Sequence, residues 1–289
     1  MKTRIMEKTR DYGRMIKFSH TVFVLPFALS AVVLAWQIHP FSMWDLAWIL
    51  VAMVGARSAA MGFNRIVDAA IDGKNPRTAI REIPSGILSK KEALLFVAVS
   101  SLAFILAAAM LSPLCFMLSF PVLAALLFYS YTKRFTQYCH LYLGFAMALA
   151  PVGAWVAVTG TITPGVVFMA ASLWTYIAGF DILYACQDID FDREQGLFSL
   201  PASLGPENAM KVSTLLHVMT MFFFTAMFFA FDMHPVFLLF LAGIGILLVI
   251  EHRLVNPGDL SRINIAFFHM NSIVSVMLLA GVITEVILR

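Results

Sequence analysis

The stretch GFNRIVDAAIDGKNPRTAIREIPSG, from Gly62 to Gly86, contains the pattern that decides both the fold and the chemistry of this chain. It closes an apolar run long enough to lie in a bilayer. Asn64, Asp68 and Asp72 stand in it at intervals of four residues. Residues four apart share one face of a helix. The pattern therefore predicts a membrane helix that ends in a ladder of oxygen-bearing side chains, followed directly by an arginine-rich segment.

The composition indicates an all-α polytopic membrane protein. Of the 289 residues, 61% are hydrophobic and only 13% are charged, whereas soluble domains average about 45–50% and about 25%. The mean hydropathy is +0.85. The three cysteines have no metal-ligand spacing, and their odd number argues against a disulfide framework. We therefore expect them to be buried, reduced thiols.

Apolar runs of about 20 residues are long enough to cross a bilayer, and the sequence contains nine of them. The first follows a basic N-terminal arm, but its length and the spans after it indicate a retained helix rather than a cleaved signal peptide. The predicted spans are approximately 18–38, 45–70, 91–111, 114–132, 138–158, 163–185, 209–231, 235–251 and 264–288.

Lysine and arginine concentrate in alternate connections, which predicts the orientation. The connections near 39–44, 112–113, 159–162 and 232–234 contain neither residue, whereas the N-terminal arm and the other connections contain nearly all of them. Because basic residues mark cytoplasmic loops, we expect a cytoplasmic N-terminus. With nine spans the C-terminus lies outside, so Arg289 is the one basic residue that does not follow this distribution.

An internal repeat relates the two halves of the chain. Asp68 corresponds to Asp188 and Asp72 to Asp192, both 120 residues later, and each ladder ends the second span of a four-span unit. The pattern predicts one domain over residues 1–289, with repeat units at about 14–132 and 138–251 and a ninth helix at about 264–288. Repeats often place a site between halves, so we expect a central cavity that opens toward the cytoplasm.

The two ladders predict a Mg²⁺ site. Ionisable residues in spans are costly and are functional by default. Carboxylate and amide oxygens suit Mg²⁺, which binds through one or two carboxylates plus substrate phosphates. The predicted metal ligands are Asn64, Asp68, Asp72, Asp188 and Asp192. An Asp at a helix end is, taken singly, more often a solvated interfacial residue, but two matched ladders are not expected by that account.

Basic residues beside the ladders suit phosphate oxygens. The predicted diphosphate contacts are Lys74, Arg77, Arg81, Tyr131, Lys133 and Arg134. Arg57 lies seven residues before Asn64 on the same face, where an ion pair with the ladder is its simplest role.

At these residues the chain resembles the UbiA superfamily of intramembrane prenyltransferases. The first family motif, NxxxDxxxD, is present as Asn64, Asp68 and Asp72. The second, DxxYxxxDxxxD, is present as Asp181, Tyr184, Asp188 and Asp192. Arg57 and the segment RTAIREIPSG also resemble the 4-hydroxybenzoate branch of the family. One departure is Arg65, which replaces an Asp of many members and removes one potential metal oxygen.

The resemblance implies transfer of a polyprenyl group from a polyprenyl diphosphate to a hydroxylated aromatic acid, with Mg²⁺ as cofactor, in quinone biosynthesis. It also implies a place in the bacterial cytoplasmic (inner) membrane, with the active site facing the cytoplasm. It implies ionisation to an allylic cation followed by attack of an aromatic ring. The predicted catalytic set is Asp181, Arg57 and Tyr184. We expect Asp181 near the acceptor, assisting loss of its proton, and Arg57 or a nearby cation on its carboxylate.

Two acceptors stay open, and prenyl transfer to another acceptor within the family is the alternative to both. The segment MIKFSHTVFVLPFAL, which contains His20, resembles a UbiA-like branch that uses 1,4-dihydroxy-6-naphthoate, and other features resemble the 4-hydroxybenzoate enzymes. As a lone histidine at a helix start, His20 is more often an interfacial hydrogen-bonding residue than an acceptor contact. Neither nucleic acid nor an obligate protein partner is expected.

Two alternatives come from other functional classes. An ion-coupled transporter would also carry intramembrane charges and a repeat, but these repeats are parallel and the acidic residues gather at one mouth. A Mg²⁺-dependent phosphotransferase acting on lipid alcohols would show a DGxxAR-type signature, and Asp72-Gly73 is followed instead by Lys-Asn-Pro-Arg.

Overall fold

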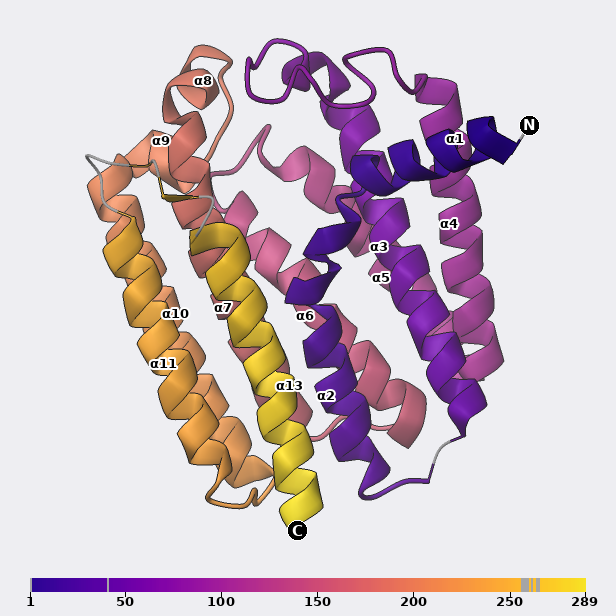
Figure 1. Cartoon of the computed structure of the whole chain (residues 1–289), viewed down its shortest axis with the longest axis vertical. Helices are drawn as coiled ribbons and strands as arrows, with labels where there is room; N and C mark the ends of the chain where they lie inside the picture. Colours follow the sequence, from indigo (N-terminus) through magenta and orange to yellow (C-terminus); the bar gives the residue numbers. More distant parts are fainter. Residues whose placement is uncertain (1, 41, 256–259, 261, 264–265) are drawn as a thin grey trace. The chain divides into compact units, whose positions relative to one another are not determined.

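The computed structural model describes residues 2–40, 42–255, 260, 262–263 and 266–289, and every element in this part of the chain is helical. The chain divides into two compact units, residues 1–21 with 43–131 and residues 22–42 with 132–289. Within the described ranges, nine helices are long and apolar enough to cross a membrane. The predicted all-α fold with nine spans is confirmed, and Figure 1 traces the order of the elements.

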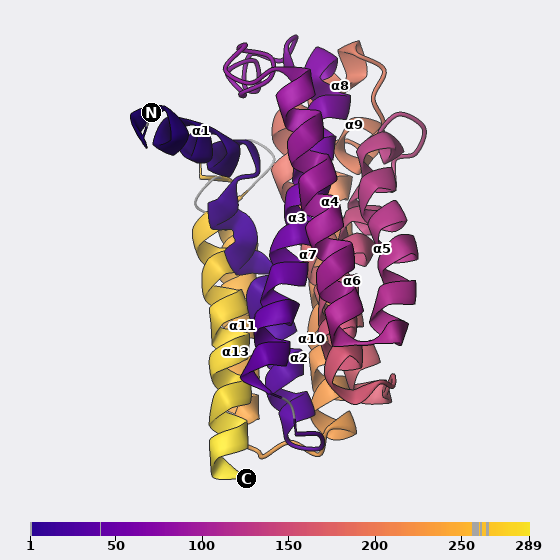
Figure 2. The ribbon, with the colours of Figure 1, turned by 90° about the vertical axis from the view of Figure 1, so that its right-hand side faces the viewer.

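The first unit consists of α1 (Lys2–Met15), α3 (Met43–Asp72), α4 (Lys90–Leu111) and α5 (Pro113–Thr132). Helices α3 and α4 lie side by side, as both views show (Figures 1 and 2). A Cβ at Gly55 would lie 2.9 Å from the Ser100 carbonyl oxygen on α4, so the close approach of these helices requires glycine there. Helix α4 begins with a capping box between Ser89 and Glu92, which satisfies backbone donors at its first turn.

The N-terminal arm is more than a topology signal, because α1 packs on the start of α4. The rings of Tyr12 and Phe96 stack with centroids 4.9 Å apart, and Met15 and Ile16 join a buried cluster with Leu88. The arm is therefore held in place by apolar contacts near the end of α3.

The second unit contains the remaining helices: α2 (Leu25–Trp36), α6 (Cys139–Thr159), α7 (Pro164–Ala185), α8 (Ile189–Glu194), α9 (Leu200–Leu204), α10 (Pro206–Ala230), α11 (Phe237–Leu254) and α13 (Asn271–Leu288). The helix pairs that pack together form a closed circuit, α7–α6–α2–α13–α11–α10 and back to α7. Two short helices lie between longer ones, the 3-10 turn η2 (Cys186–Asp188) and the π-helical turn η3 (Ala266–Met270), and the 3-10 helix η1 (Phe18–Phe23) runs across the division between the units.

The division into two units does not follow the predicted repeat boundaries. Helix α2, which the sequence assigns to the first four-span unit, packs with α6 and α13. The internal repeat was inferred from corresponding residues in the sequence, and it stays a prediction. The first two residues of the predicted ninth span, 264–265, lie outside the described residues. Its described part crosses as Phe268–Leu288.

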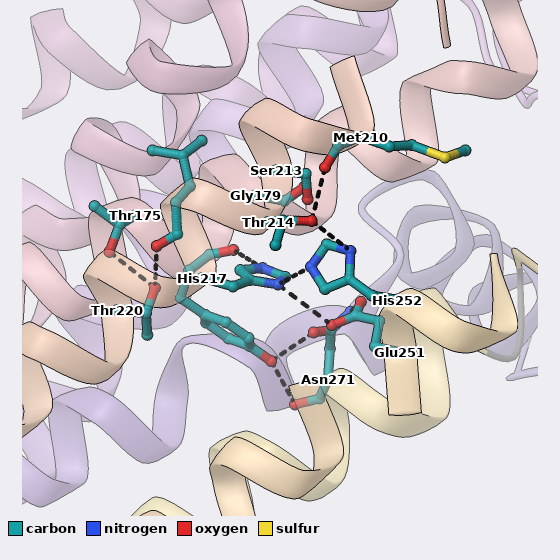
Figure 3. A network of polar contacts seen from close by, with 12 residues as sticks. Thr175, Gly179, Met210, Ser213, Thr214, His217, Thr220, Glu251, His252 and Asn271 are labelled. Atoms are coloured by element: carbon teal, nitrogen blue, oxygen red, sulfur yellow. Dashed lines mark hydrogen bonds and ion pairs between the residues drawn. The ribbon is translucent and has the colours of Figure 1, made fainter. Parts of the chain in front are cut away.

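Inside the second unit, polar side chains form a buried network across four helices (Figure 3). The Tyr176 hydroxyl on α7 donates to Asn271 Oδ1 on α13 (2.7 Å), and Asn271 Nδ2 donates to Glu251 Oε1 on α11 (3.1 Å). His217 on α10 meets His252 with 2.9 Å between Nδ1 and Nε2. Lipid offers no hydrogen-bond partners, so polar groups at this depth must bond to one another. All three cysteines are buried and free, as predicted.

Candidate functional site

The first ladder lies along one continuous face of α3, as its spacing predicts. Helix α3 runs without interruption to Asp72, and Asn64 Nδ2 donates to Asp68 Oδ2 over 3.1 Å. Asp68 and Asp72 are both buried. Two buried carboxylates one turn apart repel each other unless cations lie nearby. Because the amide nitrogen of Asn64 donates to Asp68, the Asn64 side-chain oxygen is the atom that could bind a metal.

Arg81 supplies one of those cations. Its Nη1 lies 2.7 Å from both carboxylate oxygens of Asp72. The segment between them folds back on the helix end, with Thr78 Oγ1 donating to the Asp72 carbonyl (3.0 Å) and the Arg77 backbone N–H to Asn75 Oδ1 (2.9 Å). Because the C-terminal end of a helix has negative partial charge, Asp72 requires a cation at this position.

Arg57 and Arg65 hold the chain that follows α1. Arg57 Nη2 donates to the carbonyl oxygens of Lys17 (3.1 Å) and Ile16 (3.4 Å), and Arg65 Nε donates to that of Met15 (3.1 Å). The expected pairing of Arg57 with the ladder is thus replaced by bonds to the main chain. Arg65, the departure from the family motif, anchors the same segment.

Lys17 is a residue that the sequence reasoning missed. Its φ of +46° places it in the left-handed region, at the bend where α1 ends, and this conformation is uncommon for a residue other than glycine. Burial and, after it, the positive charges of Arg65, Arg81 and Arg77 together lower the pKa of Lys17 to about 8. Lys17 thus lies within electrostatic reach of three arginines, one of which, Arg81, pairs with the buried Asp72, and this concentration of positive charge suits an anion. The sequence signal was only a basic residue before the first span.

Tyr131 lies close to the start of the first ladder. Its ring meets that of Phe63, the residue before Asn64, edge to face with centroids 6.0 Å apart. The end of α5 and the ladder of α3 therefore lie together within the first unit. Lys74 is exposed on the segment after α3, and Arg77 is half-buried.

The second ladder differs from its prediction, because it is not one continuous α-helix. Asp181 and Tyr184 belong to α7, Asp188 ends the 3-10 turn η2, and Asp192 lies on α8. A 3-10 helix advances about 120° per residue instead of about 100°, so a turn of this kind rotates the following side chains by roughly 60°. Asp188 therefore does not share the helix face of Asp181 and Tyr184 that a continuous α-helix would give it.

Asp192 is fixed by the loop that follows it. Ser199 Oγ donates to Asp192 Oδ2 over 2.8 Å, and the same hydroxyl caps the first turn of α9. The Phe198 backbone N–H donates to the Lys133 carbonyl (2.8 Å), which joins this loop to the segment carrying Lys133 and Arg134. Both of these basic residues are half-buried.

Asp181 has a partner that sequence reasoning did not identify. His140 Nδ1 on α6 lies 2.7 Å from Asp181 Oδ2. The imidazole side chain is 4% exposed and the carboxylate side chain 21%. The two residues are 41 positions apart, and only the packing of α6 on α7 brings them together.

The carboxylates are therefore divided between the units, with Asp68 and Asp72 on the first and Asp181, Asp188 and Asp192 on the second. Among the described residues, no three His, Cys, Asp or Glu side chains are grouped so that they could hold a metal ion. The assignment of metal ligands stays a prediction.

Comparison with known proteins places this architecture in a family. Residues 24–273 match the UbiA prenyltransferase family. The chain belongs to the UbiA prenyltransferase family. It is thus an enzyme, a prenyltransferase, and an integral membrane protein.

Relatives of known name or structure agree with this family assignment. The 4-hydroxybenzoate octaprenyltransferase of Vibrio atlanticus (strain LGP32) is 29% identical over 272 residues, covering 91% of this chain and 93% of that protein. A UbiA homologue from Aeropyrum pernix K1, solved without ligand, superposes with a TM-score of 0.83 at 33% identity, covering 92% of this chain and 98% of that one. A UbiA homologue from Archaeoglobus fulgidus, solved with DMAPP and Mg²⁺, has a TM-score of 0.74 at 18% identity, covers 96% of this chain and 100% of that one, and shares the fold.

Proposed function

We propose that this UbiA-family enzyme transfers a polyprenyl group from a polyprenyl diphosphate to a hydroxylated aromatic acid, of the 4-hydroxybenzoate or 1,4-dihydroxy-6-naphthoate type. The observation that carries the proposal is the end of α3. Asp68 and Asp72 are buried there, Arg81 pairs with Asp72, and Lys17 lies within electrostatic reach of Arg81. Oxygen ligands for a hard metal and donors for phosphate oxygens occur together, as a diphosphate substrate requires.

The residues present fit Mg²⁺. The proposed ligands offer only oxygen atoms, which Mg²⁺ prefers, and they are the buried or half-buried side chains of Asn64, Asp68, Asp72, Asp188 and Asp192. The Archaeoglobus homologue was solved with this ion and a prenyl diphosphate. When bound, Mg²⁺ would neutralise charge on the diphosphate and make it a better leaving group.

The basic residues take the role of holding the leaving group. In the first unit these are Lys74, Arg77 and Arg81, with Tyr131 beside the ladder, and in the second unit Lys133 and Arg134. Arginine donors match phosphate oxygens in geometry as well as charge. Donors placed where negative charge develops stabilise the transition state most.

The acceptor step is proposed to involve Asp181. Its carboxylate removes the proton of the acceptor hydroxyl, and the electrons left on oxygen make the ring carbon beside it nucleophilic. The C–O bond of the donor breaks with its electron pair on the diphosphate, and the activated ring carbon bonds to the allylic cation that remains. The ring then loses its C–H proton and the oxygen recovers a proton from Asp181, so one proton is released for each diphosphate. Tyr184, one turn from Asp181 on α7, is proposed to help position the acceptor. Arg57 is proposed to bind its carboxylate.

The relatives named for 4-hydroxybenzoate favour acids of this size and shape. The bacterial source of these relatives supports a place in the bacterial cytoplasmic (inner) membrane. The distribution of basic loops supports an orientation with the ladders toward the cytoplasm.

The test uses purified protein in liposomes with Mg²⁺, one prenyl diphosphate and each of the two acids, followed by product masses and diphosphate release. We expect a prenylated acid and one diphosphate per turnover, both abolished by EDTA. Asp68→Asn and Asp188→Asn should lower turnover at least 100-fold, whereas the exposed Asp190→Asn, between two of the proposed ligands, serves as the matched control. Ion movement without Mg²⁺-dependent diphosphate release would instead support a transporter.

A further inference from the structure

The contact between His140 and Asp181 joins two helices of the second unit. His140 is the second residue of α6, and Asp181 lies near the end of α7. One turn after His140, a Cβ at Gly144 would lie 2.2 Å from the Trp174 carbonyl oxygen on α7. The absence of a side chain at Gly144 thus lets the two helices approach closely. This approach, together with the Trp174 Nε1–H bond to the Leu141 carbonyl (2.7 Å), sets the imidazole against the carboxylate.

The surroundings of the ring determine which nitrogen carries the proton. His140 Nε2 is buried and has no hydrogen-bond partner in the described part of the chain. The thiol of Cys139 also lies close to the ring, but it donates to the Phe198 carbonyl. A proton on Nε2 would be buried without an acceptor, which costs roughly 1–3 kcal/mol. The neutral tautomer with its proton on Nδ1 avoids this cost and donates to Asp181 Oδ2.

The relative exposure of the two side chains assigns their roles. Asp181 is 21% exposed and His140 only 4%, so the carboxylate is the group that a substrate can reach, with the imidazole behind it. A hydrogen bond to one oxygen fixes the plane of the carboxylate and leaves the other oxygen as the one that meets the acceptor. In hydrolytic triads the order is reversed, with the carboxylate behind the imidazole.

We propose that His140 is a positioning residue for proton removal from the aromatic acceptor, acting through Asp181. Its Nδ1–H holds Oδ2, and Asp181 Oδ1 takes the proton of the acceptor hydroxyl. This inference rests on the proposed function, because it specifies how the acceptor step of that reaction is organised. It concerns only residues of the second unit and none of the proposed metal ligands.

The first experiment compares His140→Leu and His140→Asn in the liposome assay. Leucine removes the donor, and the Asn amide nitrogen can occupy the position of Nδ1. Losing a residue that orients a metal ligand typically costs about 10- to 100-fold, and we expect a loss of similar size for a residue that orients a catalytic carboxylate. We expect His140→Leu to lower kcat by this amount, with the KM for prenyl diphosphate within about twofold of wild type, and His140→Asn to recover to within about threefold. His39→Leu, an exposed histidine, is the matched control.

A second measurement separates positioning from structural damage. A ring-fluorinated acceptor has a more acidic hydroxyl and needs less help from a base. The ratio of wild-type to His140→Leu turnover should therefore fall toward one with this acceptor. An unchanged ratio would overturn the proposal, and so would equal losses in the Leu and Asn variants or full activity in His140→Leu.

Failure of the broader function has a different signature. If wild-type protein prenylates neither acid, yet releases diphosphate in a Mg²⁺-dependent way, then the acceptor class is wrong and the inference about His140 fails with it. If the wild type forms product and only the His140 pattern is absent, the proposed function stands and the positioning role alone is refuted.

Discussion

The ion pair between Asp72 and Arg81 gives a prediction whose size follows from its geometry. Arg81 Nη1 lies 2.7 Å from both oxygens of a carboxylate side chain that is 6% exposed, while the Arg81 side chain is 21% exposed. Breaking a buried pair costs about 3–5 kcal/mol, because one charge stays buried without a partner. Here one nitrogen serves both oxygens, so the stronger two-nitrogen arrangement is not formed, and Arg81 is partly in contact with solvent. We therefore expect Arg81→Gln to cost about 2–3 kcal/mol.

Asp72→Asn should cost less, about 1–2 kcal/mol, because the remaining arginine can turn toward water. In the double variant the losses should fall short of additivity by about 1.5–2 kcal/mol. The free energy of unfolding can be followed by SDS titration in lipid–detergent micelles. In a Cys139→Ser, Cys186→Ser background, pulses of a thiol-reactive dye report exposure of Cys115, which belongs to the first unit. Arg10→Gln, an exposed arginine on α1, is the control. Losses that add within about 0.5 kcal/mol would refute the coupling.

Three further predictions concern packing, pH and the buried network. Gly144→Ala should lose at least about 1–3 kcal/mol through overpacking, whereas Gly153→Ala on the same helix, where an added Cβ would meet nothing within 4 Å, should stay unchanged or gain up to about 1 kcal/mol. The SDS titration for the second unit uses a Cys115→Ser background, in which the dye reports exposure of Cys139 and Cys186. Because the pKa of Lys17 is lowered to about 8, its protonated fraction falls from about 0.9 at pH 7 to about 0.1 at pH 9. Affinity for prenyl diphosphate, measured by calorimetry, should therefore weaken across this window and should weaken less in Lys17→Arg. The unfolded state binds more protons than the folded state between about pH 8 and the ordinary lysine pKa, so stability should rise with pH over that range. Glu251→Gln keeps an acceptor for Asn271, so its free energy of unfolding should stay within about 1 kcal/mol of the wild-type value. Glu251→Leu leaves the Asn271 amide donor unpaired, so its free energy of unfolding should fall by roughly 2–3 kcal/mol.

The spans could be predicted because each is a local property of the sequence. An apolar run of sufficient length must become a helix in lipid, since the backbone has no other partner there. The continuity of α3 through Asp72 follows in the same way, and with it the shared face of Asn64 and Asp68. The break between Tyr184 and Asp188 could not be predicted, because a 3-10 turn differs from an α-helix only by a small shift in hydrogen bonding.

The partners of the charged residues depended on contacts between distant segments. His140 and Asp181 meet through the packing of α6 on α7, and no spacing in the sequence indicates that crossing. Arg57 had a plausible partner on its own helix, yet it donates to the carbonyl oxygens of Ile16 and Lys17, because the bend after α1 brings these main-chain oxygens to it. The sequence was enough to identify these residues as candidate functional residues, whereas their contact partners could be identified only in the tertiary structure.

The chain of bonds from Tyr176 through Asn271 to Glu251 also limits how relatives of this protein can diverge. Replacing one member leaves a donor or acceptor of the next without a partner at a depth where water does not reach. Accepted changes at these three positions should therefore be correlated across species, appearing as compensated sets rather than one at a time. Phe222 and Phe229, which are exposed on the neighbouring α10, make no such bonds and should vary independently among apolar residues. A survey of natural sequences would then show correlated positions inside the helix circuit and independent drift on its outer surface.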